Sequence, residues 1–593
     1  MGTPNRSRMS PSPNLARRDP LPEYVGATKG SASYNAHTYP TKVPPAAIVP
    51  FIEASTLPGG LVADPFSGSG MTGVAALLCG RNAVLSDLSP GAVHLSRNHT
   101  RHVNADRMHE VVATMGRVWM DRLEREMYTS SLIDPDVTGI ARHTIWSESY
   151  LCPSCGVPVV LWDVIDAEFA LPKVIRCDGC GFRFDRTTVR STSSTPVDVV
   201  VKPDGGGKLV SGRPTVATLD SITRVGAARL RHWVPNDFID PSREMYIRSA
   251  LHLRGIKTVA DFFARRPKLA LARLNHEIGK VDDRDVREAL HFAFTNTAWH
   301  ASKMRRYNAR GGQRPLTGTL FIPQLISEPN VFEVFRNQVR QLGRFYDQFP
   351  SGATEVDVHC GSATNLSWIA DQSVDYVFTD PPFGNNIHYA DCNIVWEAWL
   401  GEVTNNDAEI VVNKSRRLEN GGKTVADYQR LLAEAFREAR RVVVPNGRVS
   451  IVFHNSDDAV WSALLDAVET AGLHQAEVSI LDKGQRSQKG YKVRQGELVP
   501  FYDLVMTFTP DKSMVPRLNG AGHLALDVVN DHLGRIAAGP APERGLDYLY
   551  SIAVGGVIRS GARPVGLSLR AFETLCETNL HKVGQHYYLA VER

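Results

Sequence analysis

The sequence lacks the apolar segments that mark membrane-spanning and secreted proteins. No stretch of its 593 residues reaches the roughly 18 consecutive apolar residues that a spanning helix needs. The N-terminal segment MGTPNRSRMSPSPNLARRDP has no apolar core of the kind that a secretory signal carries. Hydrophobic residues at 43% and charged residues at 22% are ordinary for globular cores, which disfavours global disorder and fibrous repeats. We therefore expect a soluble cytoplasmic protein with no membrane partner.

Cysteine is scarce and the net charge is small. Eight cysteines are far too few for a disulfide scaffold, so a reducing compartment is expected. The formal charge of +4 does not by itself indicate a polyanionic partner. The positive charge is nevertheless concentrated, because residues 224–310 hold 18 Lys and Arg against 9 Asp and Glu, a local excess larger than that of the whole chain.

The order of the apolar segments predicts an α/β fold made of two halves. Buried strands are expected at 61–63 and 83–87, joined through a helix, which implies parallel pairing in an open sheet. Similar strands resume only at 355–359, 374–379, 449–453 and 502–508, so the stretch between is predicted to be an insertion. The predicted divisions are a flexible basic arm (1–30), a first sheet half (31–105), the insertion (106–350), a second sheet half (351–510) and a C-terminal unit (511–593).

The insertion has three predicted parts. Residues 145–186 carry two CxxC pairs, residues 187–220 are rich in Ser, Thr and Gly and are predicted to be a linker or mobile loop, and residues 224–345 are helical and basic. Residues 545–593 are predicted as helix, loop, helix and closing strand. That outline is compatible with a winged-helix module, and equally with helix packing that makes no DNA contact.

A glycine turn follows the first predicted strand. The segment DPFSGSGMTG satisfies the GxGxxG pattern, in which Gly68 and Gly70 let the backbone approach a ligand closely. Asp87 ends the next strand, where a carboxylate can accept hydrogen bonds from both hydroxyls of a ribose. NAD, S-adenosylmethionine (SAM) and a ligand-free tight turn are the three interpretations. Asp64 favours SAM, because a carboxylate there suits an ammonium and a sulfonium and is misplaced against a pyrophosphate.

A second motif, TDPPFG, ends the strand predicted at 374–379. This is the carboxyl edge of the sheet, where open α/β folds bind their ligands. The motif suits methylation of an exocyclic amine: the Asp380 carboxylate and the Pro381 carbonyl can accept the two amine hydrogens, and Phe383 can stack on an extruded base. The two prolines, Pro381 and Pro382, fix the turn.

Together the two motifs resemble those of amino-group DNA methyltransferases, which make N6-methyladenine or N4-methylcytosine. The resemblance covers roughly residues 34–100 and 355–510, and it includes the segments HTYPTKVPPAAIVPFIEAST, YADCNIVWEAWL and YQRLLAEAFREARRVVVPNGRVSIVFHN. It implies a Rossmann-like SAM-dependent methyltransferase sheet, S-adenosyl-L-methionine as cofactor and DNA as partner. It is also compatible with restriction-modification or phage-defence partner proteins.

The resemblance assigns roles by position. It implies a SAM site lined by Asp64, Phe66, Gly68, Ser69, Gly70 and Thr72, with Asp87 on the ribose, and chemistry at Asp380, Pro381, Pro382 and Phe383. The sequence departs from the family pattern in two respects. The SAM half precedes the catalytic half, and Ser362 stands where a family member often has an acid that contacts the adenine amine of the cofactor.

The two CxxC pairs predict a structural zinc site. Each pair is followed by glycine, which suits two knuckle turns whose thiolates close a tetrahedral site, with a redox pair as the alternative. Such a ribbon either braces the insertion or contacts nucleic acid, and the chain resembles large bacterial and archaeal DNA methylases that contain a zinc ribbon. The predicted ligands are Cys152, Cys155, Cys177 and Cys180.

A basic segment at 302–314 predicts nucleic-acid contact. It contains five basic residues and no acid, so it can follow a phosphate backbone, although solvated surface is the alternative. The segment Arg265-Arg266-Pro267-Lys268 is a weaker candidate of the same kind. The predicted contact residues are Lys303, Arg305, Arg306, Tyr307, Arg310 and Arg314.

Three functions follow from these motifs. The first is a SAM-dependent DNA methyltransferase that modifies a flipped adenine at N6 or, as the nearest variant, a cytosine at N4. The second is an RNA methyltransferase of the tRNA guanine-N2 type, which shares the Asp-Pro-Pro-aromatic-Gly segment. The third is a non-catalytic zinc-ribbon nucleic-acid binder. The intact catalytic motifs argue against the third, and the ribbon and basic segment favour DNA.

Overall fold

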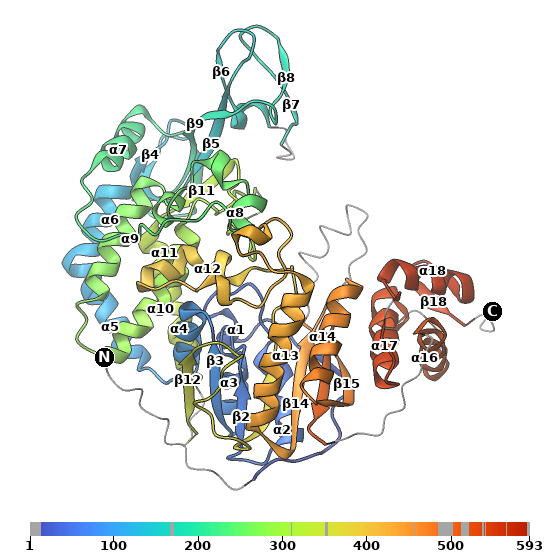
Figure 1. The fold of residues 1–593 in the computed structure, drawn as a ribbon. Helices are drawn as coiled ribbons and strands as arrows, with labels where there is room; N and C mark the ends of the chain where they lie inside the picture. Colours follow the sequence, from blue (N-terminus) through green and yellow to red (C-terminus); the bar gives the residue numbers. More distant parts are fainter. Residues whose placement is uncertain are drawn as a thin grey trace.

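The computed structural model describes most of the chain. The described residues are 14–165, 171–309, 311–349, 354–455, 457–483, 502–511, 521–536, 539, 541–564 and 566–589. A large sheet lies at the bottom of Figure 1, the region between its halves rises above it, and a helical C-terminal unit lies beside it. No helix within the described ranges combines the length and apolar character needed to cross a bilayer.

The main sheet has eight strands and mixed direction. Five strands are parallel in the order β12, β3, β2, β13 and β14, while β16 runs antiparallel between β14 and β15. The predicted α/β class and the predicted strands are confirmed, whereas β1 and β15 were not predicted. In sheet order the strands are β1 (Tyr24–Gly26), β15 (His474–Asp482), β16 (Asp503–Thr509), β14 (Val443–Phe453), β13 (Val374–Thr379), β2 (Leu61–Asp64), β3 (Asn82–Asp87) and β12 (Val356–Cys360).

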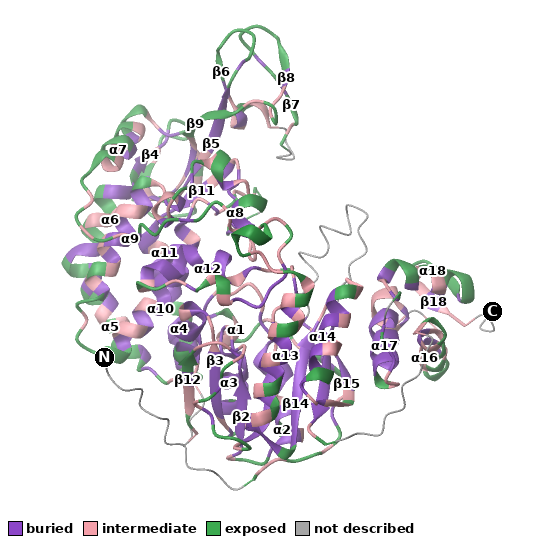
Figure 2. Ribbon diagram, viewed as in Figure 1, coloured by how far each residue is buried: buried purple, intermediate pink, exposed green. Residues whose placement is uncertain are grey.

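Helices cover both faces of this sheet. Strand residues alternate between two buried clusters: Val62 and Tyr376 pack with α2 and α3, whereas Ala63 and Val377 pack with α13 and α14. The central strands β2 and β13 are buried along their whole length, and Figure 2 shows the middle of the sheet as buried. The helices flanking the sheet and its loops are α1 (Ala32–Asn35), α2 (Pro45–Ser55), α3 (Met71–Leu78), α4 (Pro90–His99), α12 (Tyr389–Glu397), α13 (Val425–Val442) and α14 (Asp458–Thr470).

The chain leaves the main sheet after β3 and returns at β12, the strand that pairs with β3. The residues between form a second, antiparallel sheet and a helical layer. The strands are β4 (Thr129–Ser131), β5 (Thr138–Leu151), β6 (Pro158–Val160), β9 (Ser191–Pro203), β10 (Val210–Gly212) and β11 (Leu325–Pro329), with the separate pair β7 (Val174–Arg176) and β8 (Arg183–Asp185). The helices are α5 (Ala105–Met115), α6 (Asp121–Tyr128), α7 (Val216–Ala227), α8 (Glu244–Arg248), α9 (Arg265–Ile278), α10 (Arg284–Ala301) and α11 (Val331–Tyr346).

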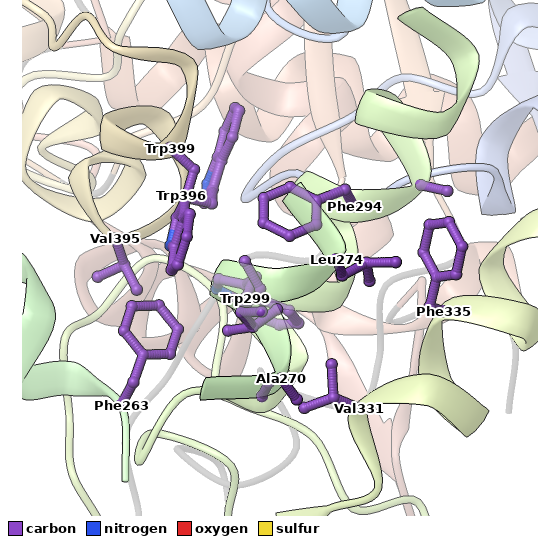
Figure 3. Packing of buried hydrophobic residues seen from close by; sticks show 14 of the residues in the cluster. Phe263, Ala270, Leu274, Phe294, Trp299, Val331, Phe335, Val395, Trp396 and Trp399 are labelled. Carbon is purple, nitrogen blue, oxygen red and sulfur yellow. The ribbon is translucent and has the colours of Figure 1, made fainter. Parts of the chain in front are cut away.

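One hydrophobic core joins this inserted region to the main sheet. Trp396 in α12 and Trp399 just after it belong to the same buried cluster as Phe263, Phe294 and Leu274 (Figure 3). The Trp399 ring contacts Phe294 edge-on, with centroids 5.3 Å apart. Because α12 directly follows the TDPPFG loop, the inserted region packs against the element that carries this motif.

The structure corrects the linker predicted at 187–220. Most of that segment is β9, β10 and the start of α7, and β9 pairs antiparallel with β5. Its high content of Ser and Thr is typical of a linker. However, Val199 and Val201 alternate into the core, and Val and Thr both favour strands.

The predicted flexible arm is also corrected for residues 14–30. Tyr24 to Gly26 form β1, which adds to the sheet edge in parallel with β15. The backbone N–H of Leu15 donates to Asp375 Oδ1 at 2.8 Å, and that of Leu21 donates to Glu477 Oε2 at 3.0 Å. The backbone of this segment is therefore held by partners that lie far away in the sequence. Local composition cannot reveal such partners. Residues 1–13 lie outside the described residues.

The C-terminal residues contact the sheet closely. The described part contains α16 (Ala521–Arg535), α17 (Leu546–Arg559), α18 (Leu569–Asn579) and the hairpin of β17 (His581–Val583) and β18 (His586–Tyr588). Ala553 and Val557 of α17 share a buried cluster with Val478 and Leu504 of the sheet. The unit therefore packs on β15 and β16 and is not separate as predicted. The winged-helix assignment stays a prediction.

Candidate functional site

The glycine turn joins β2 to α3 in a conformation that favours glycine. Gly68 and Gly70 have φ values of +48° and +80°. A Cβ on Gly70 would lie 2.7 Å from the Cα of Ser96, so α4 can approach the turn only if this position has no side chain. Gly70 thus closes the turn and is not among the residues that line the neighbouring pocket, so its predicted place in the cofactor site stays a prediction.

Asp64 connects the two predicted halves of the site. Its carboxylate accepts hydrogen bonds from Thr72 Oγ1 at 2.6 Å, from Thr379 Oγ1 at 2.7 Å and from the backbone N–H of Phe66 at 3.0 Å. These donors come from α3, from β13 and from the turn. Burial raises the pKa of Asp64 to about 7. The carboxyl group therefore holds the end of β2 against the end of β13, the strand that leads to Asp380.

Asp87 fixes the turn from the neighbouring strand. Its Oδ2 accepts from the backbone N–H of Gly68 at 2.8 Å, and its Oδ1 accepts from that of Ser89 at 2.9 Å. Burial raises its pKa to about 6. A carboxylate has about four acceptor sites, so these two bonds leave acceptor capacity for ligand hydroxyls.

A pocket opens where the two motifs meet. Its walls include most of the turn residues predicted from the sequence, together with Asp380 and Pro382 of the TDPPFG loop and Ser362 beyond β12. Pro381 and Phe383 lie outside this lining. The predicted residues that line the pocket are Asp64, Phe66, Gly68, Ser69, Thr72, Asp87, Asp380 and Pro382.

Residues distant in the sequence donate hydrogen bonds to the carbonyls of the TDPPFG loop. Tyr428 Oη donates to the Pro382 carbonyl at 2.6 Å, Asn455 Nδ2 donates to the Phe383 carbonyl at 3.0 Å, and the backbone N–H of Val412 donates to the Gly384 carbonyl at 3.2 Å. Among the described residues, no donor contacts the Pro381 carbonyl. That carbonyl retains its capacity to accept a hydrogen bond from a ligand.

Lys483 forms an ionic network with Asp380 that the sequence did not indicate. Its Nζ lies 2.7 Å from Asp503 Oδ2 and 3.4 Å from Asp380 Oδ2. The Asp380 side chain is 21% exposed. Burial raises the pKa of Asp380 to about 6, while the nearby ammonium lowers it and so opposes the effect of burial. Lys483 Nζ also lies 6.0 Å from the centroid of the Phe383 ring.

Residues before β2 and after the TDPPFG loop form the opposite wall of the pocket. The rings of Tyr39 and Tyr389 stack with centroids 5.8 Å apart, and Tyr389 Oη lies 2.7 Å from Thr41 Oγ1. Lys42 is buried beside them, and its Nζ donates to the Tyr34 carbonyl at 2.7 Å. Burial lowers the pKa of Lys42 to about 7. These residues fall in segments that resemble the family, although their roles were not predicted.

Glu409 adds a buried carboxyl to this wall. Its Oε1 accepts from the backbone N–H of Ala390 at 3.0 Å, and its Oε2 has no partner within the described residues. Burial, followed by the nearby Asp391 carboxylate, raises the pKa of Glu409 to about 8. No motif surrounds this residue, so only the fold reveals it.

Two comparisons find similarity to known proteins over short parts of the chain. Residues 20–98 match the family model described as DNA methylase. This segment is therefore similar to the amino-group DNA methylase family. A stretch of 65 residues, 11% of the chain, is 45% identical to "Putative methylase YubD" of Escherichia coli (strain K12) and covers 27% of that relative. Both matches are shorter than the chain, so the zinc-ribbon subtype stays a prediction.

The four cysteines lie in the turn between β5 and β6 and in the turn between β7 and β8, and Figure 1 shows β6, β7 and β8 at the outer tip of the inserted region. Their sulfur atoms all lie within 4.8 Å of one another, and two pairs, Cys152 with Cys180 and Cys155 with Cys177, are 3.6 Å apart. A tetrahedral zinc site with bonds of about 2.3 Å has sulfurs roughly 3.8 Å apart, so this donor set fits the ion. The glycines after each pair have positive φ, as knuckle turns require.

The basic segment at 302–314 does not form one continuous surface. Arg306 and Arg314 are exposed, and the backbone N–H of Arg306 donates to the Arg314 carbonyl at 3.4 Å. Arg305 is largely buried, which lowers its pKa to about 10. The Tyr307 ring packs edge-on against Trp162, with centroids 5.3 Å apart. Arg310 lies outside the described residues, and Lys303 lines a second cavity.

Proposed function

We propose that this chain is a SAM-dependent DNA methyltransferase that modifies the exocyclic amine of a flipped base, N6 of adenine or N4 of cytosine. The observation that carries the proposal is the contact between the two motifs. Asp64, at the start of the glycine turn, accepts a hydrogen bond from Thr379, the residue before Asp380. The two motifs therefore share one pocket at the carboxyl ends of adjacent parallel strands.

The fold supports a Rossmann-like methyltransferase sheet with a large insertion. Strands from both chain halves alternate with helices that cover both faces, as in doubly wound folds. Residues 106–350 leave the sheet and return beside the strand from which they left. We therefore assign 31–105 and 351–510 to one catalytic domain and treat the residues between as its insertion.

The pocket suits SAM. Asp87 retains acceptor capacity for ribose hydroxyls, and the buried Glu409 carboxyl, whose Oε2 has no partner within the described residues, offers a hydrogen-bonding group to a ligand. Ser362 stands where an acid often contacts the cofactor adenine, and its hydroxyl lies 2.9 Å from Thr364 Oγ1. When bound, SAM supplies an electrophilic methyl group. The expected cofactor residues are Asp64, Phe66, Gly68, Ser69, Thr72 and Asp87, while Gly70 acts by closing the turn.

The catalytic loop suits an amine acceptor. The target nitrogen must keep its lone pair directed at the methyl group, which requires two fixed hydrogen-bond acceptors for its two hydrogens. Asp380 supplies one acceptor, which the adjacent Lys483 ammonium helps to keep ionised. The Pro381 carbonyl supplies the other acceptor. Phe383 lies beside this pair, where an extruded base could stack on its ring.

We assign zinc a structural role. Four thiolates fill a tetrahedral coordination shell, so no coordination position is left for catalysis. DNA is the proposed partner, and a restriction or phage-defence protein remains a prediction. An RNA substrate of the tRNA guanine-N2 type and a non-catalytic binding role are the alternatives that experiment must separate.

The Asp380→Ala variant tests the proposed chemistry. Loss of one fixed acceptor should lower methylation of DNA by roughly 100-fold or more, as removal of a key electrostatic group does in other enzymes. SAM binding, followed by calorimetry, should change little. The exposed Asp371 serves as the matched control, because Asp371→Ala makes the same change outside the pocket. Unchanged methylation by Asp380→Ala would refute the assignment.

A further inference from the structure

A second cavity lies in the inserted region, away from the pocket shared by the two motifs. Its volume is about 650 Å³. One wall is the end of β5 and the start of β9, another is the first turn of α9, and a third is the end of α10. Only part of the cavity lining was predicted from the sequence to contact nucleic acid. That part is Lys303 and the segment Arg265 to Lys268.

Two lysines in this cavity lack a direct ionic partner. Among the described residues, no carboxylate pairs with the ammonium group of Lys268 or Lys303. The other charges nearby are already matched: Arg254 pairs with Glu148, and Glu328 pairs with the buried Arg266 at 2.6 Å. The lining therefore carries excess positive charge at its two lysines.

The remaining neighbours do not cancel that charge. Arg265, also on the wall, donates to the carbonyls of Gly226 and Ala228 and stays positive. Asp261 attracts both lysines, but this one carboxylate faces three cations, because Arg265 adds its charge beside Lys268. Partial burial lowers the pKa of Lys268 and of Lys303, and Lys268 also lowers that of Lys303. Two like charges in a partly dehydrated cavity are costly unless an anion offsets them.

The rest of the wall suits a phosphate ester. The first turn of α9 opens at Ala264, which provides no side-chain cap, so its N–H groups add positive potential. Residues 191–194 also line the cavity; Ser191 and Thr192 donate their hydroxyl hydrogens to the Ser193 and Ser149 carbonyls, which leaves the hydroxyls of Ser193 and Ser194 as candidate donors to phosphate oxygens. Trp146 and Phe263 add aromatic surface, and Trp146 Nε1 has no acceptor within the described residues.

One short segment links the cavity to the catalytic loop. Leu253 and Arg254 line the cavity at the end of the helical stretch that begins with α8. At the start of that stretch, Arg243 forms an ion pair with Asp391 of α12 at 2.9 Å. Arg248 Nη1 donates to the Asn385 carbonyl at 3.4 Å, immediately after the TDPPFG motif. A ligand strand that runs from the catalytic loop along this stretch would reach the cavity.

We propose that this cavity binds a backbone phosphate of the nucleic-acid substrate through Lys268 and Lys303. The inference rests on the proposed function for the identity of the strand. A free nucleotide offers the same phosphate chemistry, so the experiment must distinguish the two sources. The site lies apart from the predicted cofactor pocket, and its loss should therefore leave SAM binding intact.

The test compares two double variants of the full chain. Lys268→Gln/Lys303→Gln removes both ammonium groups from the cavity. Lys202→Gln/Lys208→Gln makes the same charge change at two exposed positions at the other end of the second sheet. Thermal melting and SAM calorimetry establish that each variant is folded. Fluorescence anisotropy then measures binding of a labelled DNA duplex between 50 and 200 mM salt, with no methylation required.

The cavity variant should bind DNA roughly 8-fold more weakly at 0.1 M salt, and its salt slope should fall by about 0.9, the contribution of one phosphate contact. The control variant should lose much less affinity for DNA. If DNA binding is unchanged but pyrophosphate stabilises only the wild-type cavity against heat, the phosphate comes from a free nucleotide and the strand assignment is wrong. If neither DNA nor pyrophosphate distinguishes the variants, the cavity is not a phosphate site. None of these readouts depends on methylation, so an inactive enzyme would refute the proposed function without deciding this inference.

Discussion

At the scale of single residues, the site depends on carboxyl groups that are held in place by buried donors. Asp64 and Asp87 each accept hydrogen bonds from the turn they support, so both shape the pocket before any ligand arrives. Asp380 differs, because its nearby partner is an ammonium group and not a backbone donor. Its ionisation state therefore depends on Lys483, a side chain that is close in space but 103 residues away in the sequence.

The pH dependence of catalysis should reveal the role of Lys483. Burial raises the pKa of Asp380 and Lys483 lowers it, so removing the ammonium group should raise that pKa further above about 6. In Lys483→Met the acid limb of the kcat profile should move to higher pH by about 1 to 3 units, with partial recovery in alkaline buffer. Lys483→Arg keeps the charge and should keep the profile. A uniform loss at every pH would instead indicate a purely structural role.

Gly70 offers a stability test within the turn. Gly70→Ala places a Cβ 2.7 Å from the Ser96 Cα at a backbone φ of +80°. Gly80 is the matched control, because its φ is +71° and a Cβ there meets no atom within 4 Å. Urea denaturation should show that Gly70→Ala lowers the free energy of unfolding by about 1–3 kcal/mol more than Gly80→Ala does. Equal losses of stability in the two variants would show that α4 moves away from the turn without a cost in free energy.

At the scale of elements, the strands that carry motifs could be predicted from the sequence. The strands that form only by pairing with a distant strand edge could not. The residues of β2, β3 and β13 form continuous apolar runs that end in chemically distinctive residues, so the sequence indicates both the strand and the site. By contrast, β1 and β9 are polar or short, and they become strands only because a distant strand edge supplies their hydrogen bonds.

The same limit applies to the site residues. Lys483 lies 103 residues after Asp380, and Glu409 lies in a loop without a motif, so folding alone brings them to the pocket. Conversely, Tyr307 and Arg305 look like surface residues in the sequence, yet both are packed against neighbouring parts of the inserted region. The charge of a sequence segment does not indicate whether its side chains are buried.

The zinc ribbon gives a prediction at the scale of elements. The wild-type chain should carry about one zinc ion, measured by plasma mass spectrometry, because the four sulfurs fit one tetrahedral site. Cys155→Ser should lose the ion and increase hydrogen exchange in β6, β7 and β8, while SAM binding persists. Cys360→Ser, at an exposed cysteine outside the cluster, is the control. Full zinc occupancy in Cys155→Ser would contradict the predicted ligand set.

At the scale of the whole molecule, three units surround one chemical site. The main sheet brings the two motifs together, the inserted region packs on α12 beside the catalytic loop, and the C-terminal helices pack on β15 and β16. Figure 1 shows the inserted region above the sheet and the C-terminal helices beside β15. Under the proposed function, the chemistry belongs to the sheet, and the inserted region is the proposed site of further contacts with the substrate strand.

The identity of the methylated product tests this account most directly. Purified protein is incubated with isotope-labelled SAM and either duplex DNA or bulk tRNA, and the nucleosides are then identified by mass spectrometry. The account predicts labelled N6-methyladenine or N4-methylcytosine from DNA, lost in Asp380→Ala. Labelled methylguanosine from tRNA, or no labelled nucleoside from either polymer, would contradict it.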